Sequence, residues 1–522
     1  MSLKNALFLV ALFSVSLVCS RAETYYYDTV QYKLSDATDI SIQTLTVEVD
    51  GETKYLWYTL DSEGNRVNCT EFPAFTAEDS IVFAHCDNNI GTNNKKVWLD
   101  VDINVASVEY SMTYTTLVSN NGSTLTTTGD FILNSYMYYY GAGNLKVGGN
   151  LTINCAAMGS PDARRGILDS LWVEGVTTIR GATNNRPSLY VGTGSGSIDN
   201  PDSVFKGGIT ATAVQNQTEN YMYDGSPLTL GMGGTDSGVV NRNVYSWING
   251  ASGTAAFMVN STAASTGSWT IVFTNNAGDA SSSSSLYQTA ASGAKMSIVM
   301  RSVDFDNDKN ITGYKDYSQS FTGSEFSFTG GVTLLSGGLY LNYGAETSSS
   351  VNHGNLKLAR ESGAASAKFG NSGNAGGNFL FADMEVSDGG GTIVVKMDYA
   401  EGGSGIVCDT LTLSGSAKGE GAVIIDLKNF NGNNPDEFID FMIENDVGIK
   451  VISWAEAAES GITFTTTDDY KVYDYYGEQY YFTVQNAADG LYITYTVPEP
   501  AEWAAILGLA AIALAAHRRR RK

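Results

Sequence analysis

An acidic segment in the second half of the chain carries the residue types best suited to holding a metal ion. Side-chain oxygens stand at alternating positions there, on Asp304, Asp306, Asp308 and Asn310. Ca²⁺ prefers oxygen ligands, and this alternation is typical of calcium-binding loops. Lys309, however, stands where a glycine would make the turn, and Lys315 stands where a bidentate carboxylate belongs. Two interpretations stay open, a Ca²⁺ site and a plain acidic surface loop.

Residues for nucleophilic or acid–base catalysis are few and scattered. Cys86 directly follows His85, but neighbours on a strand point to opposite faces, so we expect both to pack rather than to form a nucleophile–base pair. The sequence contains no G-x-S-x-G, H-E-x-x-H or P-loop motif. Polysaccharide-cleaving enzymes need clustered carboxylates, whereas those of this chain are dispersed. We therefore predict no catalytic residues and no enzymatic activity.

Cysteine spacing gives one structural expectation. No C-x-x-C spacing occurs, so neither a zinc ribbon nor a redox motif is indicated. Cys69 and Cys86 are close enough in sequence to form a disulfide in an oxidising compartment, whereas Cys155 and Cys408 are far apart.

Charge and composition bound the partners and the fold class. The formal net charge is −24, and because nucleic acids are bound by basic patches we expect no nucleic-acid partner. Apolar residues make up 43% of the chain, which is too high for a disordered protein. Glycine (56) and tyrosine (30) are abundant and proline (8) is scarce, a balance typical of strands joined by tight turns. We predict an all-β protein.

Short alternating segments with glycine or asparagine at their corners recur along the chain. Examples are Leu145–Ile153, Leu171–Ile179, Gly330–Leu341 and Asp409–Gly415. A corner often needs a positive φ, which glycine and asparagine tolerate best. Antiparallel hairpin stacks or sandwiches could use such strands, but the recurring bend between two strands favours a right-handed parallel β-helix, a solenoid of stacked rungs. In this style of repeat, the segments Ala77–Phe83, Lys96–Val101, Ala106–Tyr110 and Thr124–Phe131 resemble the opening rungs of autotransporter-like passenger domains.

Four further local expectations concern single segments. The low-complexity stretch Ala280–Ser285 is expected to be a loop ejected from a rung. Asn434–Ile443 and Ser453–Glu459 are expected to be short helices. The strands Tyr480–Val484 and Leu491–Tyr495 are expected to form a hairpin that closes the C-terminal end of the solenoid.

The first 22 residues predict a secretory signal peptide. Lys4 precedes an apolar run, and Ser20 and Ala22 supply the small residues of a cleavage site, so we expect passage through the Sec translocon and cleavage after Ala22. Cys19 raises the alternative of a lipoprotein anchor, which the bulky Val18 before it disfavours.

The last 26 residues have three parts in a fixed order. A rigid motif comes first, Val497, Pro498, Glu499 and Pro500, and the apolar run Trp503–Ala516 follows it. The chain ends on a membrane stop of five basic residues, Arg518, Arg519, Arg520, Arg521 and Lys522. From Val497 onward the segment approaches the roughly 20 residues that a bilayer-spanning helix needs, and the basic end marks the cytoplasmic side. A plain C-terminal membrane anchor would satisfy this physics equally well.

This tail resembles the PEP-CTERM sorting signal of exported bacterial proteins. The resemblance implies an exosortase-type processing enzyme as partner, acting at Pro498, Glu499 and Pro500, and transient anchoring in the inner membrane by a single transmembrane sorting helix. A GPI-anchored protein would end on its hydrophobic run, whereas this chain ends on basic residues.

These observations give four expected parts and two hypotheses about function. The parts are the signal peptide (1–22), an N-terminal β region with the first rungs (23–130), a solenoid passenger (131–496) and the sorting signal (497–522). The first hypothesis is a structural or adhesive protein of the cell surface or extracellular matrix, with extracellular polysaccharide as a partner. The alternative is a β-helix carbohydrate-active enzyme, a polysaccharide lyase or glycoside hydrolase, delivered by the same signal.

Overall fold

The computed structural model describes residues 22–27, 39–43, 46–49, 51–83, 95–110, 115–119, 122–134, 143–154, 164–168, 170–180, 187–192, 194–212, 229–233, 242–253, 256–260, 263–288, 292–323, 326–343, 351–399, 405–428, 442, 448–467, 473–475 and 478–496. These residues form 47 β-strands, which confirms the all-β prediction. The chain divides into an N-terminal unit, Met1–Pro187, and a C-terminal unit, Ser188–Lys522. The boundary expected between residues 130 and 131 lies inside the N-terminal unit.

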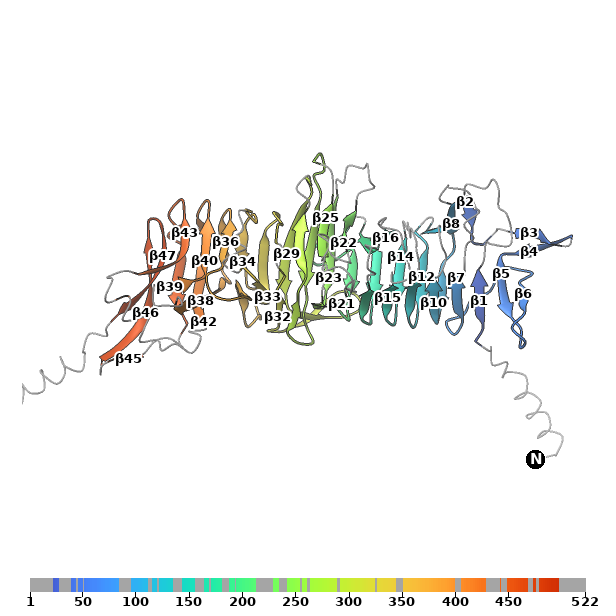
Figure 1. The fold of residues 1–522 in the computed structure, drawn as a ribbon, viewed down its shortest axis with the longest axis horizontal. Coiled ribbons are helices and arrows are strands. Elements are labelled where there is room, and N and C mark those ends of the chain that lie inside the picture. The colour runs from blue at the N-terminus through green and yellow to red at the C-terminus, as the bar shows by residue number, and fades with distance from the viewer. Residues whose placement is uncertain are drawn as a thin grey trace, which may run out of the picture. The chain divides into compact units, whose positions relative to one another are not determined.

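Parallel ladders of strands make up most of the described N-terminal unit (Figure 1). The first ladder is β1 (Thr24–Tyr27), β7 (Ser80–Phe83), β10 (Ser107–Tyr110), β13 (Phe131–Asn134), β15 (Leu151–Asn154) and β18 (Thr177–Arg180). The second is β9 (Ile103–Val105), β12 (Thr124–Thr127), β14 (Asn144–Val147) and β17 (Ser170–Val173). The third is β2 (Asp39–Ser41), β8 (Lys95–Leu99) and β11 (Thr115–Ser119), and β16 spans Arg164–Leu168. The chain alternates between ladders and returns one position further on, which is the stacking of rungs in a β-helix-like fold.

Register within a ladder places like side chains on one another. In the first ladder Ile81, Val108, Phe131 and Leu151 are successive partners, and each is at most 3% exposed. On each strand, the residues directly before and after these point outward and are more exposed, because side chains alternate along a strand. The interior of the unit is therefore a set of apolar columns that run across the rungs.

Antiparallel strands cover the first rung. β5 (Trp57–Leu60) pairs antiparallel with β1 and with β6 (Arg66–Asn68). Trp57 is fully buried and its ring lies 5.0 Å from those of Tyr27 and Phe75. The strands break at the buried Leu56, because β4 (Glu52–Tyr55) forms a separate hairpin with β3 (Thr46–Val49).

A glycine pair makes the corner between β14 and β15, where the sequence predicted a bend. A Cβ at Gly149 would lie 2.4 Å from Asp130 Oδ1, and one at Gly148 would lie 2.6 Å from the carbonyl oxygen of Thr128. Neither glycine has a positive φ. The corner therefore requires glycine for close approach of two rungs, not for the left-handed conformation that was expected.

The C-terminal unit contains two longer parallel ladders (Figure 1). Its first ladder is β21 (Ile209–Thr212), β24 (Ala251–Gly253), β27 (Ala280–Ser282), β32 (Ser318–Phe321), β33 (Val332–Leu341), β35 (Ala367–Asn371), β38 (Gly391–Tyr399), β42 (Gly421–Lys428) and β44 (Ile462–Thr466). Its second ladder is β20 (Ser203–Phe205), β23 (Asn243–Ile248), β26 (Ser268–Phe273), β29 (Lys295–Arg301), β33, β34 (Leu356–Leu358), β37 (Met384–Val386) and β41 (Ala417–Gly419). β33 belongs to both ladders, since it turns a corner at Gly337, whose φ is +76°.

Shorter sheets complete the C-terminal unit. One contains β19 (Pro187–Val191), β22 (Thr229–Gly233), β25 (Ala256–Asn260) and β28 (Ser285–Gln288). Another contains the parallel strands β36 (Asn378–Phe381), β40 (Thr410–Leu413) and β43 (Ile449–Trp454). Two small antiparallel pairings remain, β30 (Val303–Phe305) with β31 (Ile311–Tyr314), and β38 with β39 (Ile406–Cys408).

The expected C-terminal hairpin is confirmed. β46 (Glu478–Ala487) and β47 (Gly490–Thr496) pair antiparallel, and β45 (Tyr473–Tyr475) pairs with β46. β47 also pairs antiparallel with β43, so the last parallel strand of that sheet is covered by a hairpin. This arrangement protects an edge that would otherwise be open to further pairing.

Two local predictions are wrong. Ala280–Ser285 is not an ejected loop: it contains β27, and Ser282 and Ser284 are at most 2% exposed, because their hydroxyls bond to each other and Ser282 also donates to Gly253 O. Ser453–Glu459 is not a helix, since Ser453 and Trp454 belong to β43, which pairs on both sides. The other expected helix, Asn434–Ile443, lies outside the described residues except for Met442.

The signal peptide up to Arg21 and the whole sorting tail, Val497–Lys522, lie outside the described residues. In the part of the chain that the structure does describe, no helix combines the length and the hydrophobicity that a bilayer crossing requires.

Candidate functional site

The acidic segment with the candidate Ca²⁺ ligands forms the β30–β31 hairpin. Asp304 Oδ2 lies 2.9 Å from Lys315 Nζ, so this carboxylate is in an ion pair. Asp306 Oδ1 accepts hydrogen bonds of 2.9 Å from the backbone N–H groups of Asp308 and Asn310. Hydrogen bonds from Asn310 also hold the pKa of the Asp306 carboxyl below its usual value. Asp306 therefore stabilises the turn of the hairpin.

Lys309 completes this turn with a φ of +66°, the conformation that glycine adopts most easily. Its Nζ donates hydrogen bonds of 2.8 Å to Asn200 Oδ1 and to Pro201 O, which fastens the hairpin to a neighbouring loop. Across the described ranges, no group of three or more His, Cys, Asp or Glu side chains is placed to hold a metal ion. Calcium binding by Asp304, Asp306, Asp308 and Asn310 stays a prediction.

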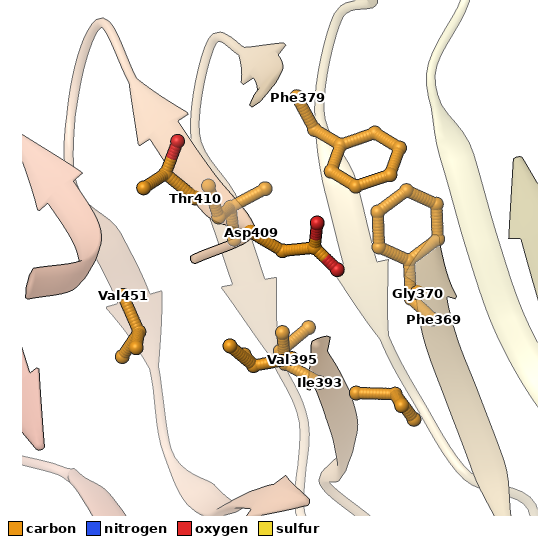
Figure 2. Close-up of a pocket in the computed structure, with 10 residues that line it drawn as sticks. Phe369, Gly370, Phe379, Ile393, Val395, Asp409, Thr410 and Val451 are labelled. Carbon is orange, nitrogen blue, oxygen red and sulfur yellow. The ribbon is translucent and has the colours of Figure 1, made fainter. Parts of the chain in front are cut away.

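A small cavity inside the C-terminal unit contains a carboxylate (Figure 2). Asp409 points between the rings of Phe369 and Phe379 on one side and Val395 on the other, and it is 3% exposed. Its Oδ1 accepts hydrogen bonds of 2.9 Å from Asn371 Nδ2 and from the backbone N–H of Gly377. Burial raises the pKa of Asp409 despite these donors.

The size of this cavity limits what it can do. Its volume of about 10 Å³ is at the lower limit for one water molecule. The second carboxylate oxygen, Asp409 Oδ2, accepts a 3.0 Å hydrogen bond from the backbone N–H of Lys396. Both oxygens are thus used to join β35, β38 and β40, and the cavity is too small for a sugar or any larger substrate.

His353 is a second buried titratable group of the C-terminal unit. It is fully buried, and its ring centroid lies 4.5 Å from that of Phe328. Its Nδ1 lies 2.9 Å from the carbonyl oxygen of Phe328, which can only accept, so Nδ1 carries the proton. Nε2 then accepts from the hydroxyl of Tyr343. Burial lowers the pKa of His353 to about 4, so the ring is a neutral part of the core.

A half-buried tyrosine lies on the outer face of the first ladder of the C-terminal unit. On β33, Leu339 and Leu341 are fully buried, so Tyr340 between them points outward. Its ring lies over Gly338 and Gly370: a Cβ at Gly338 would be 2.8 Å from Tyr340 Cε2, and one at Gly370 would be 3.2 Å from Cδ1. Desolvation, followed by the charges of Asp426, Asp316 and Asp279, raises the pKa of Tyr340 to about 12.

The sequence did not single out Tyr340. Two tyrosine-rich runs are more conspicuous in the sequence: Tyr136–Tyr140 lies outside the described residues, and Tyr473–Tyr481 contains β45 and the start of β46. Gly338 lies two positions before Tyr340 on the same strand, but Gly370 becomes a neighbour of Tyr340 only through the pairing of β33 with β35. The sequence features that could have indicated this surface are a Gly-x-Tyr segment in one strand and a glycine inside the next strand, away from any turn.

Two cysteines lie among the described residues, Cys69 and Cys408, and burial raises the pKa of each thiol. Cys86 and its neighbour His85 lie outside the described residues, so the disulfide expected between Cys69 and Cys86 stays a prediction.

Comparisons with protein-family models, curated proteins and solved structures each found no match to this chain.

Proposed function

We propose that this chain is an exported bacterial protein of the cell surface or extracellular matrix, with a structural and adhesive role. The stacking of its rungs supports this role most directly. Apolar columns fill the interior, and side chains at the corners bond to the backbone of the next rung, as Asp130 does to the N–H of Asn150 at 2.7 Å. Contacts of this kind make a stack of rungs resistant to bending, and the outward residues of each ladder provide faces for binding.

The proposed route to the surface rests on the two ends of the sequence. The signal peptide would direct the chain to the Sec translocon, and the sorting tail would hold it in the inner membrane. An exosortase-type enzyme would then process it at Pro498, Glu499 and Pro500, and the basic end from Arg518 to Lys522 would stop transfer. We also infer that the solenoid is right-handed, because connections between parallel strands of one sheet are almost always right-handed.

The alternative, a β-helix carbohydrate-active enzyme, requires two carboxylates that face one glycosidic bond. The most deeply buried carboxylate of the described rungs, Asp409, is instead engaged by three N–H donors. We therefore place the structural and adhesive role first.

Intact mass and terminal peptide mapping of the protein from its native envelope and medium would test this proposal. We expect an N-terminus at Glu23 and loss of the residues beyond the Val497–Pro500 motif. A protein that retains its tail to Lys522 would reduce the motif to a plain anchor and overturn the sorting proposal.

A further inference from the structure

We propose that the outer face around Tyr340 binds an uncharged polysaccharide by stacking a sugar ring on the tyrosine. The proposal rests on the adhesive role inferred above and specifies the class of ligand. We call the surface formed by Tyr340, Gly338, Gly370, Ser320 and Lys368 the Tyr340 platform.

The two glycines of the platform are there for space. Neither Gly338 nor Gly370 has a positive φ, so their backbone conformations are open to any residue. What a side chain could not do is share the space of the tyrosine, because a Cβ at Gly338 would be 2.8 Å from Cε2 and 3.3 Å from Cζ of Tyr340. At Gly370 a Cβ would be 2.8 Å from Val394 Cβ and 3.2 Å from Tyr340 Cδ1, so this glycine leaves room for both side chains.

The ring is also supported from below. Tyr340 and Gly370 are direct partners across β33 and β35, and Gly370 in turn pairs with Val394 on β38. Val394 points outward but is only 5% exposed. A tyrosine held this way has one face on the sheet and loses little conformational entropy on binding, which is what a stacking platform requires.

Polar residues lie on the two strands that flank Tyr340. Ser320 is the register partner of Tyr340 on β32, and Lys368 is the partner of Gly338 on β35. Lys368 Nζ lies 3.5 Å from Asp316 Oδ2, so a donor and an acceptor stand side by side. The hydroxyl of Tyr340 itself makes no hydrogen bond among the described residues. A sugar ring places weakly positive C–H groups on its faces and hydroxyls on its rim, and an aromatic face ringed by donors and acceptors complements both.

The negative charge of the protein determines which class of polysaccharide we expect to bind. Of the three carboxylates that act on Tyr340, Asp316 is paired with Lys368 and Asp426 with Lys428, Asp279 adds its negative charge, and the chain as a whole carries a formal net charge of −24. A polyuronate or a sulfated polymer would be repelled. An uncharged polymer keeps the stacking and the hydrogen bonds without this repulsion.

Affinity electrophoresis and titration calorimetry of the full-length protein in mild detergent would test the proposal. The probes are dextran and cellulose-derived oligosaccharides as uncharged polymers, with polygalacturonate as the anionic one. Tyr340→Leu keeps the cover over Gly370 but removes the aromatic face, so we expect about tenfold weaker binding, the equivalent of one aromatic contact. Tyr340→Phe keeps the face and should stay within about threefold of the parent, since only one hydroxyl is lost. Tyr492→Ala, on the C-terminal hairpin, is the matched tyrosine control and should bind normally.

Circular dichroism of each variant separates loss of fold from loss of binding. Binding of the uncharged probes that falls in Tyr340→Leu but not in Tyr492→Ala supports the platform. No binding of uncharged probes, binding of polygalacturonate alone, or equal binding by the parent and Tyr340→Leu would overturn it. These outcomes are independent of tail mapping, so failure of the platform and failure of the sorting proposal can be told apart.

Discussion

Arg301 and Glu361 form a two-point ion pair, with Nε 3.0 Å from Oε2 and Nη2 2.7 Å from Oε1. Arg301 is 7% exposed, and its remaining Nη1 reaches Asp199 Oδ1 at 2.6 Å. Arg301, at the end of β29, thereby joins two loops, one before β20 and one after β34. Their carboxylates, on Asp199 and Glu361, are 162 positions apart in sequence. Such geometry matches the planar fork of arginine and could not be reproduced by lysine.

Replacing Arg301 should be far more damaging than replacing a surface cation. Arg301 is buried and bonds to two carboxylates, so Arg301→Met removes three charge-assisted hydrogen bonds from a desolvated site, and we expect a loss of roughly 3–5 kcal/mol in the free energy of unfolding. Lys418→Met is the matched control, because Lys418 lies 2.9 Å from Asp383 but is 45% exposed. Its cost should be at most about 1 kcal/mol. Denaturant unfolding measures both, and equal losses in the two variants would contradict the prediction.

Acidification should destabilise the C-terminal unit through His353. Its pKa is about 4 when folded and 6.5 when exposed, so below pH 6.5 the unfolded chain binds a proton that the folded chain does not. Stability is therefore fully present above pH 6.5 and decreases by roughly 3 kcal/mol as the pH falls to about 4. Denaturant unfolding at pH 7, 5.5 and 4.5 measures the decrease.

The variant His353→Gln separates this effect from other titrations. Asp409 acts in the opposite sense, because its raised pKa makes stability fall as the pH rises above the ordinary aspartate value. That contribution is common to both proteins and cancels in their difference. His353→Gln should be less stable at pH 7 but lose less on acidification, and an unchanged pH dependence would refute the assignment.

The serine-rich segment offers a test with neighbouring residues. Ser282 is buried, and its hydroxyl donates to Gly253 O at 2.9 Å and bonds to Ser284 Oγ, whereas Ser281 is exposed. Ser282→Ala should cost about 1–3 kcal/mol, because two buried hydrogen bonds of the Ser282 hydroxyl are lost, one to Gly253 O and one with Ser284 Oγ. Ser281→Ala should change the free energy of unfolding by less than about 0.5 kcal/mol. Thermal unfolding of the two variants side by side checks the difference, and indistinguishable midpoints would place the segment outside the core after all.

Two linked corner side chains of the N-terminal unit should have coupled effects on the free energy of unfolding. Asp130 Oδ1 accepts from the N–H of Asn150 at 2.7 Å, and Asn150 Oδ1 accepts from the N–H of Val176 at 2.9 Å. Asp130→Ala and Asn150→Ala should each cost about 1 kcal/mol, and the double variant should depart from additivity since the two share a contact. Lys146→Ala, exposed on β14, is the control and should be nearly neutral. Strict additivity would mean that the two corners do not cooperate.

Strands and corners could be predicted because they depend on short-range pattern. The alternation in Leu145–Ile153 gave β14 and β15 with their glycine corner, and the terminal hairpin followed from two alternating runs around Asn486–Gly490. Ser453–Glu459 failed because its alanine and glutamate residues favour a helix locally, whereas pairing of Ser453 with Thr412 and Gly490 imposes a strand. The serine-rich composition of Ala280–Ser285 predicted a loop, but in the structure serine hydroxyls take the place of apolar side chains inside a rung.

The candidate surface could not be predicted because it is made across strands. Nothing in the local sequence of Gly370 shows that it pairs with Tyr340, and nothing near Asp199 shows that it meets Arg301. Both contacts depend on the register in which distant rungs stack. Sequence patterns identify where a rung turns, but they do not fix which outward residues become neighbours.

Rung stacking has a consequence for how the chain acquires its structure. Each strand of a ladder bonds to the strand before it and the strand after it, so most of its contacts are with adjacent rungs. Order can therefore grow one rung at a time from a formed end, with each completed rung serving as the template for the next. A chain that emerges progressively, from a ribosome or through a narrow pore, can fold in step with its own appearance and need not wait for its last residue.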